Sequence, residues 1–513
     1  MGSFIRLPAR ALDGRIDATY YRPEYVANAQ RLASSSVGSS VLNDLVSDGR
    51  RTLYFGTTTL DGDEAPSGWV PFLTSDDLGD DGFFIETNAR RRVAPAFLDD
   101  YPAGRLRSGE LLVKVKGPNQ TTAYIETAPD YPVLVSGTIW GGLVRKDVVD
   151  PYYLVAALSC PYAAMARTRL RTNLNVEFLG AEDLLSLAVP TPAKEAQRYI
   201  GDKVRQAERL RERARRLEAA SGAFFQLPDW TEPRAGTRRA YTARRGSMRS
   251  DRLDAPFYDP GHEDLDALLR RRGDIELRDV ASLVETRWKR TGDKFNYFEI
   301  GELDIASGIL TPTTLDVSAA PSRAQIRVEP WDVLVATVRP NRKNVGLALP
   351  PDDALALVAS TGFAVLRFEN AESAAFYHSF LRSDAATQQL MRWNSGATYP
   401  AIEGDVPLRV RAPRFDSDVV QREGRRWLQK FSALSASRGL TTIATTLVEH
   451  LIDGHVAEAD LVAAQRALDG GDRSADRELM KALRQGDAPD AKPLIADVDA
   501  LYALLDGLEG EDA

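Results

Sequence analysis

The sequence has little of what disulfide bonding, metal binding and membrane insertion require. It contains one cysteine and four histidines in 513 residues. The lone Cys160 cannot form an internal disulfide, which is typical of proteins in a reducing cytoplasm. The longest apolar stretches, such as 133–144, are interrupted by Ser and Gly and are too short to span a bilayer. The first ten residues (MGSFIRLPAR) lack the apolar core of a secretory signal. We therefore expect a cytoplasmic protein without a membrane partner.

Catalytic motifs are missing or incomplete. No Gly-Lys dipeptide occurs, which excludes a Walker-type phosphate loop. Residues 150–153 (DPYY) lack the second proline of the amide-methyltransferase motif, and an Asp before a Pro is typical of a helix start. In 109–116 (GELLVKVK) the acid is misplaced for a nuclease, and Cys160 is interpreted as an ordinary half-buried residue. His450 and His455 are interpreted as the two sides of a turn. We expect no catalytic residues, metal or cofactor; a two-domain enzyme with a degenerate site is the alternative.

Charge is distributed unevenly along the chain. The net charge is −8, but residues 440–513 contain 6 Lys and Arg against 16 Asp and Glu, a balance of −10. Residues 1–439 therefore carry +2. Their basic clusters lie at 90–92, 167–171, 209–216, 238–249, 339–343 and 422–426. Because local fields attract nucleic acid, the acidic total does not exclude a DNA-binding protein.

The chain contains an internal duplication. Residues 15–25 (RIDATYYRPEY) match 252–262 (RLDAPFYDPGH) at an offset of 237. Residues 109–119 (GELLVKVKGPN) match 331–341 (WDVLVATVRPN) at an offset of 222. The first copy should therefore carry about 15 extra residues, for which the loop 57–68 is the natural place. Matches in the same order predict two homologous modules.

Each copy ends in an amphipathic helical pattern with apolar residues three and four positions apart. We expect the two helices to pair as an antiparallel coiled coil, although Gly424 weakens the second pattern. The positions expected to pair the helices or dock partners are Val204, Leu210 and Leu217 in the first helix, and Trp427 and Phe431 in the second.

These patterns predict an α/β (α+β) fold with two tandem modules, two long helices and an acidic extension. The expected boundaries are 1–192 and 251–413 for the modules, 193–226 and 414–439 for the helices, 227–250 for a linker and 440–513 for a small helical extension. The apolar face of the extension is expected either to fold back on the coiled coil or to bind a partner.

Three elements of the chain carry a resemblance to a known family: the duplicated R-[IL]-D-A-x-[YF]-Y-x-P, the central G-[ED]-[LV]-L-V type element, and GATYPAI at 396–402. Through these elements the chain resembles the specificity subunits of type I restriction–modification systems. The resemblance covers about residues 10–440. It implies two target-recognition domains that each read half of a split site on double-stranded DNA, held apart by helices that also dock other subunits. It also implies that methyl transfer and cleavage belong to partners, namely methyltransferase subunits and a translocase–nuclease restriction subunit.

Two features depart from the family pattern. The first copy has RTNLNVEFLG at 171–180 where the second has SGATYPAIEG at 395–404, and the acidic extension is not part of the minimal pattern. The nearer alternative is therefore a similar DNA sensor in another phage-defence system, with the extension recruiting a different effector.

Side chains suited to DNA gather in two segments of each copy. Arg pairs well with guanine and Asn or Gln with adenine, whereas Lys and Ser or Thr suit phosphates. The predicted DNA-binding residues of the first copy are Lys114, Lys116, Asn119, Gln120, Thr121, Arg167, Arg169, Arg171, Asn173 and Asn175. Those of the second copy are Arg339, Asn341, Arg342, Lys343, Asn344, Arg392, Asn394 and Ser395. Tyr21 and Tyr258 are interpreted as structural.

Overall fold

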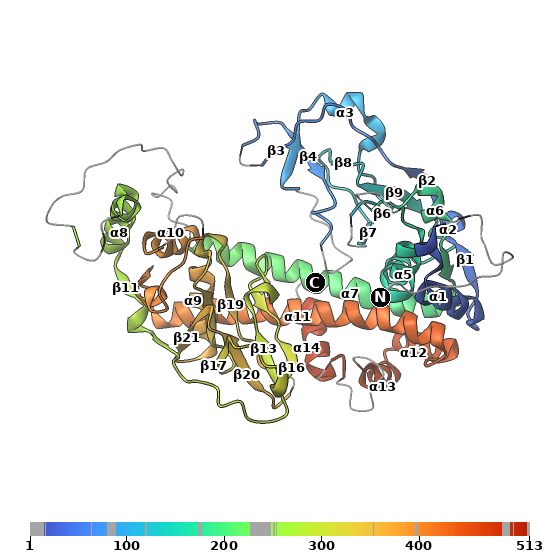
Figure 1. Cartoon of the computed structure of the whole chain (residues 1–513). Coiled ribbons are helices and arrows are strands. Elements are labelled where there is room, and N and C mark those ends of the chain that lie inside the picture. Colours follow the sequence, from blue (N-terminus) through green and yellow to red (C-terminus); the bar gives the residue numbers. More distant parts are fainter. Residues whose placement is uncertain are drawn as a thin grey trace. The chain divides into compact units, whose positions relative to one another are not determined.

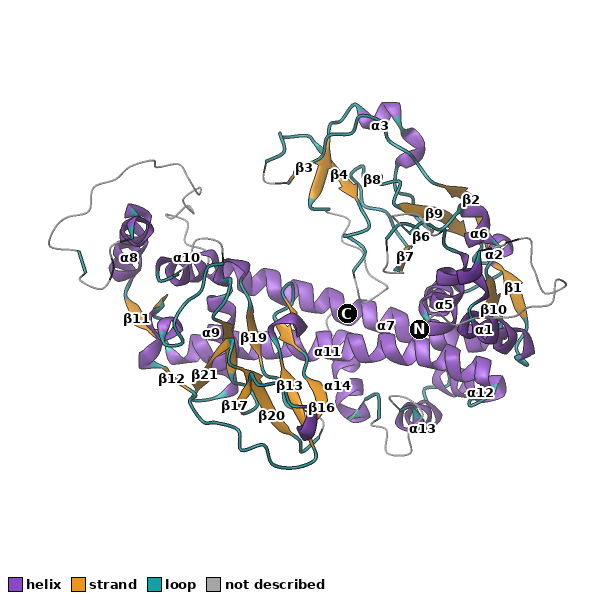
Figure 2. Cartoon of the chain, viewed as in Figure 1, coloured by secondary structure: helices purple, strands orange, loops and turns teal. Residues whose placement is uncertain are grey.

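The computed structural model describes residues 15, 17–62, 64–79, 89–117, 121–172, 177–225, 248–249, 252, 254–351, 353–395, 399–484, 493–495 and 497–509. Its contacts divide the chain into two units, the first formed by 1–212 with 434–513 and the second by 213–433. The long helices α7 (Lys194–Gly222) and α11 (Ser417–Asp453) each contribute to both units. Figures 1 and 2 show helices and strands together in both globular parts, as predicted, and helices alone at the C-terminal end. Within the described residues, no helix is both long and apolar enough to cross a membrane.

We call the globular part of the first unit module 1 (residues 15–192). Its strands are β1 (Ser39–Val41), β2 (Val46–Arg50), β3 (Leu60–Asp61), β4 (Val70–Leu73), β5 (Arg91–Val93), β6 (Glu110–Lys114), β7 (Thr122–Ile125), β8 (Leu134–Val135), β9 (Ile139–Val144) and β10 (Ala188–Pro190). Its helices are α1 (Pro23–Ser34), α2 (Leu42–Leu45), α3 (Phe97–Asp100), α4 (Pro151–Ser159), α5 (Pro161–Leu170) and α6 (Ala181–Leu185).

We call the globular part of the second unit module 2 (residues 252–413). Its strands are β11 (Asp274–Glu276), β12 (Ala281–Leu283), β13 (Lys294–Phe298), β14 (Leu303–Asp304), β15 (Ile309–Leu310), β16 (Thr313–Asp316), β17 (Ala324–Val328), β18 (Val333–Ala336), β19 (Val345–Leu347), β20 (Ala356–Ser360), β21 (Phe363–Phe368) and β22 (Arg411–Pro413). Its helices are α8 (Pro260–Arg272), α9 (Ala371–Leu381) and α10 (Asp384–Arg392).

The sheet order confirms the duplication. Module 1 has an antiparallel sheet in the order β2-β9-β6-β7, and module 2 has the same arrangement in β12-β21-β18-β19, extended by β15 and β14. In the second sheet of each module, one pair is parallel: β4 with β8, and β13 with β20. Each module also has a two-stranded antiparallel sheet, formed by β1 with β10 in module 1 and by β11 with β22 in module 2. The strand β3, which has no equivalent among the described residues of module 2, lies within the predicted extra loop 57–68.

The core of each module lies between its two larger sheets. In module 1, buried side chains of β6, β7 and β9 share a cluster with those of β4 and β8. In module 2 the equivalent cluster joins β18 and β21 to β13 and β20. The outer side of the first sheet is covered by α4 in module 1 and by α9 in module 2. Because the central strands are covered on both faces, their sequences are continuous apolar runs without polar alternation.

The opening motif of module 1 is a structural anchor. Arg15 donates to the main-chain oxygens of Leu170 at 3.0 Å and Arg171 at 3.4 Å, where α5 ends. The hydroxyl of Tyr21 donates to the carbonyl of Arg15 at 2.8 Å. The ring of Tyr20 lies between two guanidinium groups, with its centroid 4.8 Å from Arg15 and 4.0 Å from Arg169.

Module 2 repeats this anchor with the matching residues. Arg252 donates to the carbonyls of Arg392, Trp393 and Asn394, where α10 ends. Tyr258 donates to the carbonyl of Arg252 at 2.7 Å. The ring of Phe257 lies between Arg252 and Arg392, at 4.9 and 4.8 Å from their guanidinium carbons. The interpretation of Tyr21 and Tyr258 as structural is therefore confirmed.

The long helices pair in antiparallel fashion within each unit. In the first unit, Ser437 Oγ of α11 donates to the carbonyl of Ala207 of α7 at 2.8 Å. Glu458, which follows the end of α11, accepts from the backbone N–H of Ala193, just before α7, at 2.8 Å. In the second unit, Lys430 forms an ion pair with Glu218 at 2.7 Å, and the rings of Phe224 and Phe415 lie 4.6 Å apart. The end of one helix thus meets the start of the other in both places.

The predicted apolar helix positions face inward. Val204, Leu210, Trp427 and Phe431 are buried within the chain, and Leu217 is half-buried. They therefore offer little free surface to a partner. In the basic run 209–216, the side chains alternate between buried and exposed positions, as expected for one solvated helix face.

The acidic extension is not a separate appendage. Helix α11 continues past the expected boundary at 439 to Asp453, and its residues Leu440, Ile443 and Leu447 are fully buried. The extension adds α12 (Glu458–Asp469), α13 (Ser474–Ala482) and α14 (Val498–Glu509). The apolar face of the extension is buried within its own unit. Of the two expectations, folding back on the chain is therefore the one observed, and not an open face for a partner.

A buried polar cluster fixes the extension to α7. Lys203 Nζ lies 2.6 Å from Asp476 Oδ1, and both side chains are about 2% exposed. The hydroxyls of Tyr199 and Tyr502 also donate to Asp476. Burial alone would raise the pKa of Asp476, but Lys203 and the two hydroxyls outweigh that effect and hold the pKa below its usual value. The carboxylate is therefore ionised and fully paired at neutral pH.

We predict that Asp476→Ala destabilises the first unit by about 3–5 kcal/mol, because it leaves the Lys203 charge buried without its partner. The double variant Lys203→Met with Asp476→Leu should recover most of that loss, since it removes both charges. Asp506→Ala, which breaks the exposed pair with Arg473, is the control and should cost less than about 1 kcal/mol. Denaturant unfolding followed by circular dichroism would measure all three. Equal losses for the single and double variants would contradict this account.

Close packing of α11 against α9 explains why a glycine occupies position 424, where it weakens the helical pattern. A Cβ at this position would overlap the carbonyl of Glu372 at the start of α9. Helix propensity alone predicts that Gly424→Ala stabilises by about 1 kcal/mol. We predict instead a loss of about 1–3 kcal/mol from overpacking, visible as a lower melting temperature. Gly439→Ala in the same helix is the matched control, because its Cβ would meet mainly the side chain of Ile495. An increase in stability for both variants would refute the close approach of α11 to α9.

Candidate nucleic-acid interface

In module 2 the two predicted DNA-binding segments lie side by side. Val338 and Ser395 both pair with Ala401 in isolated β-bridges. The backbone N–H of Arg339 also donates to the carbonyl of Pro400 at 2.7 Å. The loop that follows β18 and the loop that follows α10 therefore form one surface, which we call the loop face of module 2 (residues 337–344, 393–395 and 399–402).

Module 1 contains the same arrangement. Lys116 and Thr172 both pair with Phe178, and the backbone N–H of Gly117 donates to the carbonyl of Glu177 at 3.1 Å. These contacts join the loop after β6 to the loop after α5. We call this surface the loop face of module 1 (residues 114–117, 121–122, 171–172 and 177–179). Two loops of divergent sequence thus occupy equivalent places on two equivalent scaffolds.

The loop face of module 2 presents polar and aromatic groups to solvent. Asn341 and Arg342 are exposed in the short 3-10 helix η10 (Pro340–Arg342), and Ser395 is exposed beside them. Arg339 lies over the ring of Tyr399 at 4.8 Å, and Tyr399 is 64% exposed. This pair is suited to stacking on a base or lying along a backbone. Sequence reasoning did not select Tyr399, although an aromatic residue within GATYPAI was an available signal.

Two residues of this face have an unusual backbone. Arg339 has φ of 51° and Lys343 has φ of 56°, on either side of η10. The left-handed conformation is unfavourable for residues with a Cβ and is concentrated at functional sites. Here it turns the chain sharply, so that Asn341 and Arg342 lie at the tip.

The side chains of three other predicted residues of module 2 already have partners within the chain, and a fourth residue is buried. Lys343 is paired with Asp384, and Asn344 is buried at 7% exposure. Arg392 pairs with Asp266 at 2.8 Å, and the amide of Asn394 donates to the carbonyl of Met391. Burial removes Asn344 from the candidate interface, whereas Lys343, Arg392 and Asn394 remain partly accessible at its edge.

Fewer residues of module 1 can be assigned. Lys116 is exposed and Lys114 is half-buried at the start of the loop. Thr121 is only 4% exposed, so its side chain does not fit a direct DNA contact. The remaining amides predicted for this face lie outside the described residues: Asn119, Gln120, Asn173 and Asn175.

Two of the arginines predicted at the end of α5, Arg167 and Arg171, are buried, and this part of the prediction is corrected. Arg167 is 1% exposed and donates to the carbonyl of Leu158 at 2.6 Å. Burial lowers the pKa of Arg167 to about 10. Arg169 stacks on Tyr20, and the buried Arg171 pairs with Glu177 at 2.5 Å. The guanidinium groups of Arg167 and Arg171 therefore hold the scaffold and are not accessible to DNA, whereas the half-buried Arg169 is engaged by Tyr20.

The acid of the central motif is structural as well. Glu110 is fully buried and pairs with Arg50 at 2.7 Å and Arg107 at 3.0 Å. The equivalent Asp332 in module 2 is 2% exposed and pairs with Arg367 at 2.8 Å. Both acids also accept the backbone N–H of the residue three positions earlier. The motif thus fixes the turn before the central strand.

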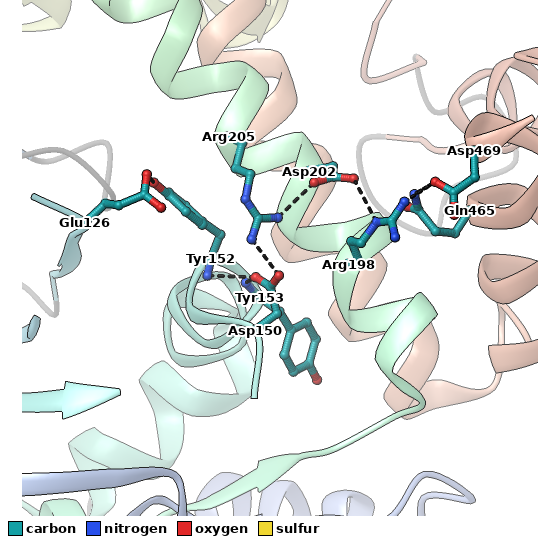
Figure 3. Close-up of polar contacts among 9 residues, drawn as sticks. All are labelled: Glu126, Asp150, Tyr152, Tyr153, Arg198, Asp202, Arg205, Gln465 and Asp469. Carbon is teal, nitrogen blue, oxygen red and sulfur yellow. Dashed lines mark hydrogen bonds and ion pairs between the residues drawn. The ribbon is translucent and has the colours of Figure 1, made fainter. Parts of the chain in front are cut away.

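Figure 3 shows the surroundings of the DPYY sequence. Asp150 caps α4 by accepting the backbone N–H groups of Tyr152 and Tyr153 at 2.9 and 3.0 Å. Its other oxygen accepts from Arg205 of α7 at 2.6 Å, and Arg205 also donates to Asp202. The helix-start interpretation is confirmed. A carboxylate held by a cap and an ion pair serves to join α4 to α7.

Cys160 is more buried than expected. It is 1% exposed, where the sequence suggested a half-buried residue, and burial raises the pKa of its thiol to about 11. A protonated, enclosed thiol is a poor nucleophile. Across the part of the chain that the structure describes, no group of three or more His, Cys, Asp or Glu side chains is placed to hold a metal ion.

No protein-family model and no curated protein matches the sequence. Among solved structures, the chain is similar to the type I restriction–modification S subunit from M. genitalium, with 13% identity and a TM-score of 0.39 over 82% of this chain and 96% of that chain. It is also similar to the HsdS subunit from Thermoanaerobacter tengcongensis, with 14% identity and a TM-score of 0.27 over 82% and 97% of the two chains. A third match, with 15% identity, a TM-score of 0.27 and coverage of 82% and 98%, comes from work on complex assembly in the type I R-M system.

The exposed tip of module 2 should select one part of a DNA site. We predict that Asn341→Ala with Arg342→Ala relaxes base preference at one half of a bipartite site by about 1–3 kcal/mol per lost bidentate contact, and leaves the other half unchanged. Selection from a pool of randomised duplexes, followed by sequencing, measures both halves together. Arg323→Ala, an exposed arginine that is not part of the loop face, is the control. Loss of preference in both halves by the folded double variant would contradict independent reading.

Proposed function

We propose that this chain is a sequence-specific DNA-recognition subunit that reads a bipartite target with its two loop faces. The observation that carries the proposal is the repeated loop face: two equivalent scaffolds present loops of different sequence, each joining the segment after a central strand to the segment after a helix. A rigid frame with variable loops is the usual way in which proteins carry specificity.

The chemistry of the module 2 loop face supports a DNA ligand. Exposed Asn341 and Arg342 carry the donors and acceptors that read adenine and guanine in the major groove. Lys343 and the stacked pair of Arg339 and Tyr399 surround them with positive charge and an aromatic face. In module 1, the exposed Lys116 supplies a cation at the equivalent place.

The same proposal assigns no catalysis to the chain. The candidate acid, thiol and arginine groups are committed to caps, buried pairs or the core, as described for Asp150, Cys160 and Arg167. We propose that DNA methyltransferase subunits perform modification, with a translocase–nuclease subunit as a further partner. Because the apolar helix positions are buried within the chain, partner docking would use exposed helix faces and module surfaces.

Methylome sequencing of cells with and without this gene tests the proposal. In the presence of methyltransferase subunits we expect a split recognition sequence to become methylated, and we expect this modification to disappear when the gene is deleted. The purified chain alone, given methyl donor and DNA, should transfer no methyl groups. Turnover by the purified chain that is lost on a point substitution within it would refute the non-catalytic assignment. An unchanged methylome together with recovery of a different effector in complex would favour the DNA-sensor alternative.

A further inference from the structure

Module 2 contains a cavity of about 540 Å³ bounded by α8, the end of α10 and the strands β11 and β22. Its wall is dominated by six arginines: Arg249, Arg270, Arg278, Arg392, Arg409 and Arg411. The wall also contains three carboxylates: Asp266, Glu276 and Asp405. Cationic groups therefore outnumber anionic groups in a small, concave volume.

The three carboxylates are already engaged by arginines of the same wall. The pairs are Asp266 with Arg392 at 2.8 Å, Asp405 with Arg409 at 2.6 Å, and Glu276 with Arg411 at 2.5 Å and Arg278 at 2.7 Å. The imidazole of His262 adds no charge near neutral pH, because burial and then Arg392 lower its pKa. Outside the wall, Arg411 also pairs with Asp274 at 2.7 Å. Among the described residues Arg270 forms no ion pair, so the cavity keeps a positive charge at Arg270 after these pairs are formed.

The duplication provides an internal comparison. Helices α1 and α8 correspond through Pro23 and Pro260, and strands β1 and β11 correspond through their pairing with β10 and β22. At the equivalent positions module 1 has Ala33 for Arg270, Asn43 for Arg278 and Ala188 for Arg411. These three arginines of the wall are therefore specific to module 2, whereas Arg392 has a counterpart in Arg169 of the shared anchor.

The cavity adjoins the loop face. Trp393 lines it and is followed in the chain by Asn394 and Ser395 of the loop face. Arg409 holds the Trp393 ring from the cavity side, with its guanidinium carbon 4.4 Å from the ring centroid. A duplex contacted by the loop face would therefore bring its backbone near the arginine wall.

We propose that this cavity is a phosphate clamp, which binds a backbone phosphate of the DNA next to the half-site read by module 2. The assignment rests on the proposed function and adds to it an asymmetry: module 2 holds the backbone more strongly than module 1. Guanidinium groups suit this role because their planar donors match phosphate oxygens. A phosphate contact contributes affinity and salt dependence without base preference.

The test compares Arg270→Ala with Arg278→Ala against a matched control of Arg271→Ala with Arg323→Ala. All four arginines are exposed, and only the first two line the cavity. The affinity of the full chain for its selected duplex is measured across a range of salt concentrations. Each lost phosphate contact should reduce the slope of log K against log salt by about 0.9, so the clamp variant should lose about 1 to 2 in slope. Its base preference at both half-sites should stay as in the wild type.

The outcomes separate the clamp from the proposed function. An unchanged slope in a clamp variant that melts like the wild type would overturn the clamp, whereas sequence-selective binding by the wild type would still uphold the recognition function. A wild type without any sequence-selective binding would refute both. Titration with inorganic pyrophosphate in the absence of DNA tests whether the cavity binds a free anion and not a DNA backbone phosphate. Pyrophosphate binding that the clamp variant loses, with no change in its DNA slope, would assign the cavity to a small anion and overturn the backbone assignment.

Discussion

Each loop face depends on one arginine that caps the helix in front of it. Arg15 and Arg252 belong to the first segment of their modules, yet they donate to the last carbonyls of α5 and α10. Those carbonyls have no partners within their helices, so a guanidinium group that binds two or three of them fixes where the helix stops. The loop begins at the next residues, Thr172 and Ser395, which pair with the opposite strand of the face. The repeated RxDA sequence thus positions a surface more than 100 residues away in the chain.

This arrangement separates the frame from the surface that it carries. The aromatic ring held between two arginines, the buried acid before the central strand and the capping hydroxyl recur in both modules, with Tyr20 replaced by Phe257 and Glu110 by Asp332. The exposed groups do not recur. A scaffold that stays folded whatever its loops contain allows the two loop faces to differ in sequence without loss of stability, as the proposed reading of two different half-sites requires.

The sequence was sufficient for the frame and insufficient for the surface. Residue matches at nearly constant offset predicted the duplication, and the three- and four-residue spacing of apolar residues predicted the two long helices, because both signals are carried by buried positions. The charge of a side chain does not indicate whether that side chain is buried or exposed. Arg167 and Arg342 look equally suited to DNA in the sequence, but one is enclosed by its module and the other is exposed at a turn. The boundary at 439 failed for a related reason. The change of net charge suggested a new domain there, whereas the apolar spacing of Leu440, Ile443 and Leu447 continues the helix to the turn at Gly454, where φ is positive.

Part of the negative charge of the extension is paired with cations of the same unit. Its carboxylates bind cations of the same unit: Asp453 with Arg31, Asp469 with Arg198, and Asp476 with Lys203. A carboxylate paired in this way neutralises a nearby cation and contributes little to the long-range field. These pairs leave the net charge at −8, but they place cations of the same unit directly beside the carboxylates and so weaken the field of the extension at a distance. The field near a DNA backbone depends on the local balance of charges, and in module 2 six arginines and three carboxylates line the cavity beside the loop face.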